Sequence, residues 1–312
     1  MAVAVLLAVA LAVGFGPRLL RHLPFPRYLP PALLGPKCQV PLQVSQYDEN
    51  GNGIPDALDL VAGARQEVAR HTLYDASYYK GGYPPEGRGA CTDLVWRAFR
   101  QAGYSLKGMV DQNIREKPDA YGATGRRPDP NIDFRRATTL DIFFKSHALS
   151  LITRVIPGNV SNLVQWQPGD IVVFGNGGHI GIISDRRRPD GVPLLIHNTG
   201  PWATEGDYLL RYPSPITGHY RFIGPDECYV PAGVIVWDGL PPDGKPMRKT
   251  VSPSVFRIFG KDHGWLGGTL EAESASSPPD SVGAGEGWIR ESDAVYPQSR
   301  ETIPWQVNVS AD

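Results

Sequence analysis

The spacing of apolar residues changes partway along this chain, from a helical pattern to a strand-like one. Three segments, 56–74, 91–102 and 138–148, carry apolar residues at helical spacing. Five short runs rich in β-branched residues follow, separated by turn residues; they span 170–175, 179–184, 193–198, 218–223 and 233–237. Helices followed by an antiparallel sheet predict an α+β domain in one piece. Gly103 is the predicted end of the second helix, and Thr138 and Thr139 are predicted caps of the third.

The composition agrees with short elements joined by many turns. Gly 35 and Pro 30 make up roughly a fifth of the 312 residues, against a usual share of about an eighth, which argues against a helical bundle. Lys and Arg (31) nearly balance Asp and Glu (32), and no basic face is interleaved with aromatic residues. The sequence therefore excludes nucleic acid as an expected partner.

The two ends of the chain differ from its middle. Residues 1–16 are apolar and uncharged, which predicts a signal peptide or a membrane anchor; a buried core helix is the alternative interpretation. Residues 17–39 read as a proline-rich linker, 40–240 as the folded domain, and 241–312 as a largely disordered tail. We therefore expect an exported protein of the cell envelope, either released or tethered to the membrane through its N-terminus.

Three cysteines are an odd number for an exported chain. Cys38 and Cys228 could form a disulfide and leave Cys91 as a free thiol, but the sequence does not fix the pairing. A free thiol in an oxidising compartment calls for a reason.

Cys91 begins a predicted helix, where the helix dipole favours the thiolate and lowers the pKa of a thiol. His179 starts a predicted strand among four glycines and is the candidate base, since a nearby imidazole can take the thiol proton. If 179–184 and 193–198 form a hairpin around a loop at 185–191, symmetric pairing places His179 opposite His197. A slip of one residue would place Asn198 there instead.

Each of these residues also has an ordinary structural interpretation. A buried cysteine is usually inert packing, and a histidine in a strand usually satisfies local hydrogen bonds. The order of a cysteine at a helix start, then a histidine in a strand, then a histidine in the next strand favours a catalytic site over these alternatives.

Three motifs carry a resemblance to a known family: "YYKGGYPPEGRGACTDLVWRAFRQAG", "WQPGDIVVFGNGGHIGIIS" and "LLIHNTG". Together they resemble the NlpC-like, papain-type cysteine peptidases that cleave peptides of the bacterial cell wall. The chain is more closely similar to an uncharacterised bacterial domain family related to them, which also shows "RPDPNIDFRR" and "TGHYR". The resemblance covers roughly residues 74–223 and implies a papain-like, NlpC-like α+β fold.

The resemblance also implies roles for individual residues. Cys91 would be the nucleophile, His179 the base and His197 the orienting residue. Tyr79 would lie beside the thiol, and the backbone N–H of Cys91 would be one oxyanion donor. Those enzymes usually have an acidic residue before the cysteine and Ser-Gly after it, whereas this chain has Ala90, Thr92 and Asp93. The difference leaves the nucleophile in place and bears on which substrate the site would recognise.

The loop at 128–136 lies between the cysteine helix and the strands and carries Asp129, Asn131 and Asp133. One interpretation is that it lines the substrate cleft. The other is a structural turn held by hydrogen bonds of its Asp and Asn side chains.

The stretch "DENGNGIPDALD" has the spacing of a twelve-residue Ca²⁺ loop. The predicted ligands, with Ile54 contributing its carbonyl, are Asp48, Asn50, Asn52, Ile54, Asp56 and Asp59. Gly53 stands at the position of the sharp turn. The twelve-residue stretch resembles bacterial extracellular calcium loops of the thrombospondin-repeat kind. The alternative is a plain Asn/Gly turn before the helix. We expect weak, structural binding of calcium that catalysis does not use.

These observations together predict an exported cysteine peptidase or amidase acting on peptidoglycan peptides. Two other classes stay open: an acyltransferase of the same fold, and a non-catalytic envelope binding module stabilised by calcium.

Overall fold

The computed structural model describes residues 38–122, 124–224, 227–251, 254–270 and 286–296. The predicted signal or anchor at 1–16 and nearly all of the linker at 17–39 lie outside these residues. Among the helices that are described, none combines the length and the hydropathy that a membrane crossing would need.

The three helices expected from periodicity are all present. They are α2 (Asp56–Ala69), α3 (Cys91–Gln101) and α6 (Ala137–His147). Gly103, with φ of 93°, follows the end of α3 as predicted. The threonine caps of α6 were wrong, because the helix starts one residue earlier and Arg136 stands at its N-cap without a side-chain bond. Unpredicted helical segments are α4 (Leu106–Glu116), α5 (Pro118–Gly122), α7 (Val160–Leu163) and 3₁₀ turns at Asp133–Arg135 and Glu291–Asp293.

The first sheet is antiparallel throughout and has the strand order β3-β8-β4-β5-β6-β7. Its strands are β3 (Leu149–Ser150), β4 (Ile171–Phe174), β5 (His179–Arg187), β6 (Pro193–Asn198), β7 (Ala203–Gly206) and β8 (Ile216–Arg221). The fold is thus mixed α and β with antiparallel sheets, as the patterns predict. The two-residue strands β1 (Leu73–Tyr74) and β2 (Arg88–Gly89) pair with each other in parallel.

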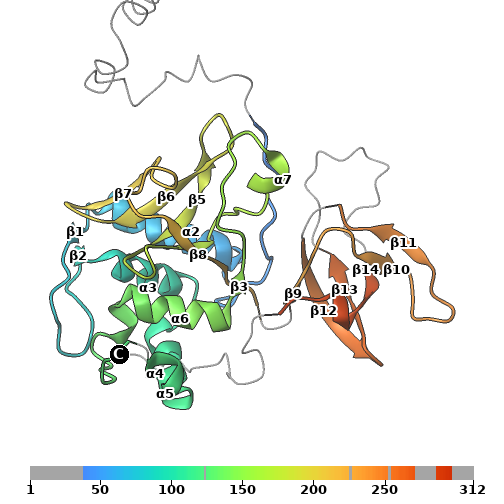
Figure 1. The fold of residues 1–312 in the computed structure, drawn as a ribbon, viewed down its shortest axis with the longest axis horizontal. Helices are drawn as coiled ribbons and strands as arrows, with labels where there is room; N and C mark the ends of the chain where they lie inside the picture. Colours follow the sequence, from blue (N-terminus) through green and yellow to red (C-terminus); the bar gives the residue numbers. More distant parts are fainter. Residues whose placement is uncertain (1–37, 123, 225–226, 252–253, 271–285, 297–312) are drawn as a thin grey trace, which may run out of the picture. The chain divides into compact units, whose positions relative to one another are not determined.

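Both faces of this sheet are buried, which explains the almost unbroken apolar runs of its central strands. Helices α2, α3 and α6 lie against one face (Figure 1), where Phe99 of α3 belongs to the same core as Ile180 and Ile182 of β5. On the other face, Trp166 packs with Val172 of β4. The sheet is therefore the rigid layer on which α3, and with it Cys91, is placed.

A buried polar cluster joins β4 to β8. The Asp170 carboxylate, 1% exposed, accepts hydrogen bonds from His219 Nε2 at 2.9 Å and from Arg221 Nε at 2.7 Å. The His219 ring stacks on Trp166 at 3.8 Å between centroids. Because the side chains of Asp170, His219 and Arg221 all have hydrogen-bond partners, the cluster fixes strand order rather than offering a reactive group.

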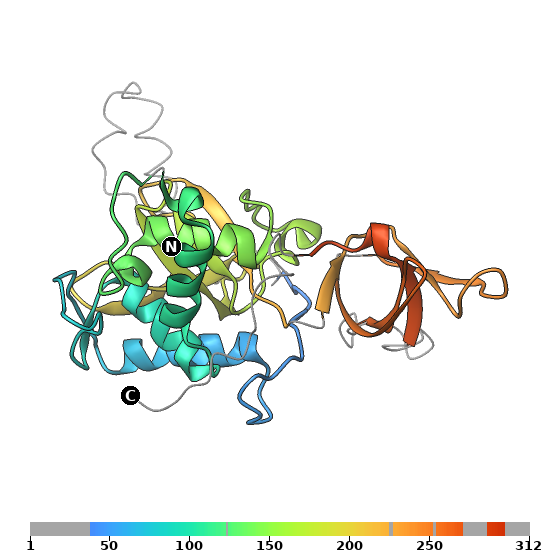
Figure 2. The same cartoon turned by 90° about the horizontal axis from the view of Figure 1, so that it is seen from below.

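The C-terminal region contains a second antiparallel sheet, of order β11-β10-β14-β13-β12-β9. Its strands are β9 (Glu227–Val230), β10 (Ile235–Trp237), β11 (Pro246–Lys249), β12 (Ser254–Asp262), β13 (Trp265–Leu270) and β14 (Glu286–Arg290). Figure 2 shows these strands as a curved sheet. The prediction of a largely disordered tail from 241 was therefore wrong for the described residues, which have a core of their own around Val236, Phe256 and Ile289.

The boundary of the first domain also moves, because β9 and β10 belong to the second sheet although the predicted domain ended at 240. None of the three cysteines is in a disulfide: Cys38 is half-buried, and Cys91 and Cys228 are buried.

Candidate functional site

Cys91 occupies the first turn of α3 and is 9% exposed. The first turn is held by Asp93, whose carboxylate accepts the backbone N–H of Ala90 at 2.6 Å. Burial raises the pKa of the Cys91 thiol to about 11, while hydrogen bonds from the backbone N–H groups of Ile180 and Thr92 act in the opposite direction. The helix start was expected to lower the pKa of this thiol. Burial outweighs it, so the resting side chain is a neutral thiol.

His179 and His197 are hydrogen-bonded to each other, with His179 Nε2 and His197 Nδ1 2.8 Å apart. The predicted hairpin is present, but its register and loop differ from the symmetric pairing. Ile182 pairs with Ile196, and continuing this register places Gly181 opposite His197. A shift of two residues leaves side chains on the same face, so the histidines still meet, diagonally rather than directly opposite.

Two glycines near His179 allow close approaches of different kinds. A Cβ on Gly181 would come within 3.2 Å of the His197 Cβ, so a larger residue there would press on the His197 side chain. A Cβ on Gly177 would come within 2.6 Å of Thr138, in the first turn of α6. The glycine-rich turn therefore packs on α6.

Both imidazoles are neutral in the resting structure. Burial lowers the pKa of His179 to about 3, with a smaller effect of His197, and lowers the pKa of His197 to about 4. Among the described residues, no hydrogen bond joins the Cys91 thiol to either ring, and His197 Nε2 is buried without a partner. The cluster is therefore a neutral thiol and a neutral histidine pair, not a preformed ion pair.

Two tyrosines that the sequence reasoning missed lie at this site. The Tyr212 ring stacks on His179 with centroids 4.5 Å apart. Burial, first of all, raises the pKa of both Tyr74 and Tyr212, and each is near enough to Cys91 for the thiol charge to add to that effect. We refer to Cys91, His179, His197, Tyr74 and Tyr212 as the cysteine–histidine cluster. The only sequence signal for Tyr212 was an aromatic residue in a loop following the histidine strands.

Tyr79, the tyrosine expected beside the thiol, has other partners. Its hydroxyl donates to Asp75 at 2.7 Å, and the guanidinium of Arg135 lies 5.2 Å from its ring centre. Tyr79 is therefore held by Asp75, and Tyr212 is a tyrosine that packs on the candidate base His179.

Asn198 does not orient His179. Its side-chain amide donates to the carbonyl oxygens of Thr72 at 3.1 Å and Gly89 at 2.9 Å. Because Gly89 lies two residues before Cys91, Asn198 ties the end of β6 to the segment that leads into α3. Of the two candidates left open by the register, His197 is the one that contacts His179.

The loop at 128–136 is held by its own side chains. Asp133 Oδ2 accepts the backbone N–H of Asp129 at 2.6 Å, and Asn131 Oδ1 accepts that of Gly81 at 2.8 Å. The 3₁₀ turn within this loop ends in Arg135. Its guanidinium binds both oxygens of Asp93, Nε to Oδ1 at 2.7 Å and Nη2 to Oδ2 at 2.9 Å. The loop thus positions Arg135 against the first turn of the cysteine helix.

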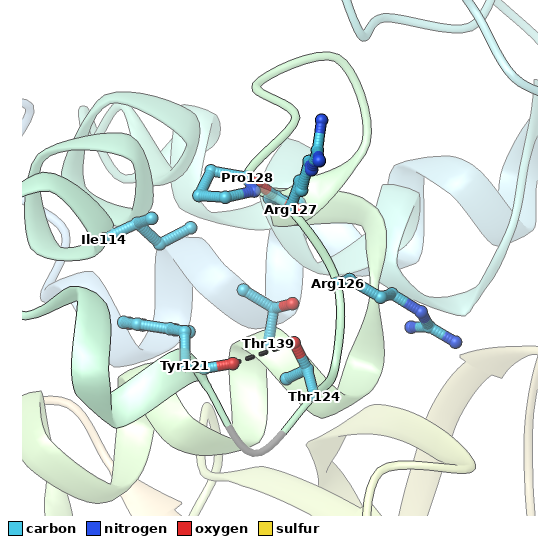
Figure 3. A pocket seen from close by; sticks show the side chains of 8 residues that line it. Ile114, Tyr121, Thr124, Arg126, Arg127, Pro128 and Thr139 are labelled. Carbon is cyan, nitrogen blue, oxygen red and sulfur yellow. Dashed lines mark hydrogen bonds between the residues drawn. The ribbon is translucent and has the colours of Figure 1, made fainter.

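A separate pocket lies beside this loop (Figure 3). Its lining residues are Ile114, Tyr121, Thr124, Arg126, Arg127, Pro128, Asp133 and Thr139. The Thr124 hydroxyl donates to the Tyr121 carbonyl at 2.8 Å and closes one side. No member of the cysteine–histidine cluster lines this pocket. Asp133 therefore belongs to a different site from the cluster.

The five predicted calcium ligands that would bind through their side chains fall into two sets. Asn50 and Asn52 both direct their side chains at Asp59, and Asp48 accepts backbone N–H groups of the same loop. Asp56 faces elsewhere: it accepts the backbone N–H of Glu49 at 2.9 Å and the Tyr104 hydroxyl. Burial raises the pKa of Asp56 to about 6.

The raised pKa of Cys91 predicts slow alkylation. In a chain whose other cysteines are changed, Cys38→Ser and Cys228→Ser, we expect iodoacetamide at pH 7 to react about 100-fold more slowly than with the same chain in urea, because a pKa raised by about two units leaves about one hundredth of the thiolate. The rate should rise with pH until about 11. Rapid alkylation with a midpoint below pH 7 would contradict the neutral thiol.

Comparison with known proteins places this site within a family. A family model described as a domain of unknown function, DUF1287, matches residues 61–222, a range that includes the cysteine–histidine cluster. The uncharacterized protein YijF of Escherichia coli (strain K12) is 37% identical over 194 residues, which cover 59% of this chain and 87% of that protein. The chain belongs to the DUF1287 family.

Proposed function

We propose that the chain is a cysteine-dependent hydrolase that cleaves an amide bond. Cys91 would be the nucleophile, His179 the general base and His197 the residue that positions it. The observation that carries the proposal is the His179–His197 hydrogen bond of 2.8 Å beside a thiol at the first turn of a helix. The sulfur also accepts backbone N–H groups, which would stabilise negative charge as it develops.

The pairing assigns the nitrogen atoms. His179 Nε2 faces His197 Nδ1, so Nδ1 of His179 is the atom available to the thiol. For Nδ1 to accept a proton, Nε2 must carry one and donate it to His197 Nδ1, which requires His197 to be protonated at Nε2. His197 thereby selects the reactive tautomer of His179, the role that an orienting residue has in catalytic triads.

The chemical steps balance with these groups and water. The thiol proton passes to His179 Nδ1 while sulfur bonds to the amide carbonyl carbon; the proton then passes to the leaving amine, and water releases the acyl group from sulfur. Because the pKa of the thiol is raised and that of His179 is lowered, proton transfer has to accompany attack on bound substrate.

The order of the elements supports a papain-like, NlpC-like fold and a peptide of peptidoglycan as the substrate. A cysteine helix is followed by an antiparallel sheet whose neighbouring strands carry two histidines, in the order that the resemblance implies. An exported protein, released or tethered through residues 1–16, would meet this substrate in the cell envelope. Nucleic acid forms no part of the proposal.

One observation favours a second candidate, a non-catalytic envelope binding module. The thiol is neutral, buried and not hydrogen-bonded to an imidazole in the described structure, which is also how an inert core cysteine looks. In that case the cysteine–histidine cluster would be a packed polar core, and replacing Cys91 would leave ligand binding unchanged.

The test is to incubate the full chain and its Cys91→Ala variant with isolated peptidoglycan and to identify soluble fragments by mass spectrometry. We expect fragments with newly cleaved amide bonds from the wild type, and a rate lower by about 10³-fold or more in the variant. Equal fragment release by both proteins, or none by either, would contradict the hydrolase. If no fragments appear, transfer of an acyl group to an added amine by the wild type alone would identify an acyltransferase.

A further inference from the structure

The loop at residues 48–59 contains a buried carboxylate whose bonding is incomplete. Asp59 is 1% exposed, and its Oδ1 atom has no hydrogen-bond partner in the described structure. Its Oδ2 atom accepts the side-chain amides of Asn50 and Asn52, each at 2.8 Å. The carboxylate is therefore turned toward the loop, and it forms no ion pair with any residue that the structure describes. A buried, half-satisfied carboxylate is costly unless a positive charge joins it.

The oxygen atoms needed to complete a cation site are gathered in the same loop. Asp48 Oδ2 accepts the backbone N–H of Gly53 at 2.7 Å, and Asn52 Oδ1 accepts that of Ile54 at 2.7 Å. Gly53 has φ of 84°, which turns the chain back over Asp48. Side chains at positions 1, 3, 5 and 12 of a twelve-residue loop thus converge, with the turn glycine at position 6.

We infer that this loop binds one calcium ion through the side chains of Asp48, Asn50, Asn52 and Asp59 and the carbonyl of Ile54. The ion would supply the charge that the Asp59 carboxylate lacks. Rotation of each amide about its terminal bond exchanges nitrogen for oxygen and presents a ligand in place of the present donor. Asp56 is not a direct ligand, because Tyr104 and the backbone of Glu49 already hold it.

The ligand chemistry selects the ion. Every predicted ligand atom is a neutral or anionic oxygen, the set that calcium prefers and zinc does not. Within the described ranges, no group of three or more His, Cys, Asp or Glu side chains could hold a metal; the loop differs because two of its ligands are asparagines. With only two carboxylates, the expected dissociation constant is about 10⁻⁴ to 10⁻³ M.

The same residues connect the ion to the cysteine helix. The Asn50 amide also donates to the carbonyl of Gln101, the last residue of α3, at 2.9 Å. A Cβ on Gly103 would come within 3.0 Å of the Asn50 Cβ, so the loop lies directly against the helix end. Calcium would therefore fasten the segment before α2 to the C-terminal end of α3, whose other end carries Cys91.

The test uses the full chain after treatment with a chelator. Addition of 10 mM Ca²⁺, a concentration about 10 to 100 times the expected dissociation constant, should raise the unfolding temperature by roughly 3–8 °C. The same concentration of Mg²⁺ should have a much smaller effect, because it demands a tighter octahedral site. Bound Tb³⁺, excited through nearby tyrosines, should emit and be displaced by Ca²⁺.

The variants separate calcium binding from general stability. Asp59→Asn and Asp48→Asn keep the side-chain shape and remove charge, so both should lose most of the calcium-induced shift and the Tb³⁺ emission. Asp119→Asn, at an exposed position of helix α5, is the matched control and should respond as the wild type does. A wild type that does not respond to 10 mM Ca²⁺, or an Asp59→Asn variant that responds equally, would overturn the inference. Neither result depends on peptidoglycan cleavage.

Discussion

Replacing Arg135 with methionine is expected to lower the free energy of unfolding by about 3–5 kcal/mol. The guanidinium binds both oxygens of Asp93, and the two side chains are 2% and 0% exposed. Methionine keeps the length of the side chain but leaves the Asp93 carboxylate buried with two fewer charged hydrogen bonds. Asp93 also accepts the Trp96 indole N–H at 2.9 Å, so the first turn of α3 loses support.

Urea unfolding of the full chain, with the free energy extrapolated to water, measures this effect. Arg115→Met is the matched control, because Arg115 is exposed on α4 and should change stability by no more than about 0.5 kcal/mol. The double variant Arg135→Met with Asp93→Asn should recover part of the loss, since the unpaired charge is removed. A loss below about 1 kcal/mol in Arg135→Met alone would show that the pair is not buried in solution.

Replacing His179 with alanine is expected to reduce turnover of the peptide substrate by about 10³-fold, if the proposed function is correct. The thiol then has no base, and its raised pKa keeps it protonated at neutral pH. His197→Ala should reduce turnover by about 10²-fold with little change in KM, because His179 remains but its tautomer and orientation are no longer fixed.

The rates of fragment release from peptidoglycan, compared at equal concentrations of folded protein, measure both effects. His263→Ala is the control, since the His263 side chain is 95% exposed in the turn between β12 and β13. Activity of His179→Ala within about tenfold of the wild type would contradict the assignment of the base, even if Cys91 is essential. A His197→Ala variant as poor as His179→Ala would mean that both histidines transfer the proton.

Local sequence patterns predicted the helices whose signals lie within a few residues of one another. They failed to predict which strands pair, because pairing depends on segments far apart in the chain. The helices at Asp56–Ala69 and Cys91–Gln101 were predicted because their periodicity and end signals are local. The neighbour of β4 was not predicted: β8 lies beside it although three other strands come between them in the chain. The second sheet was missed because its strands lie in a polar part of the chain with few long apolar runs, and they gain a core only by pairing with one another.

The site shows the same division. The residue types of Cys91, His179 and His197 and their order could be read from the sequence, whereas the pKa of the thiol could not, because burial outweighs the helix start only once α3 packs on the sheet. Tyr212 contacts His179 from a loop whose path depends on the whole sheet. The histidine register was wrong by two residues because Arg187 extends β5 beyond the symmetric hairpin.

The separation of Cys91 from its histidines along the chain has a consequence for biosynthesis. The helix α3 leaves the ribosome well before β5 and β6 do, and domains generally complete folding as units. Until those strands pair, the nascent polypeptide carries a thiol with no imidazole beside it. If the proposed function is correct, the nascent chain is inactive until β5 and β6 have paired, because the Cys91 thiol has no base before then.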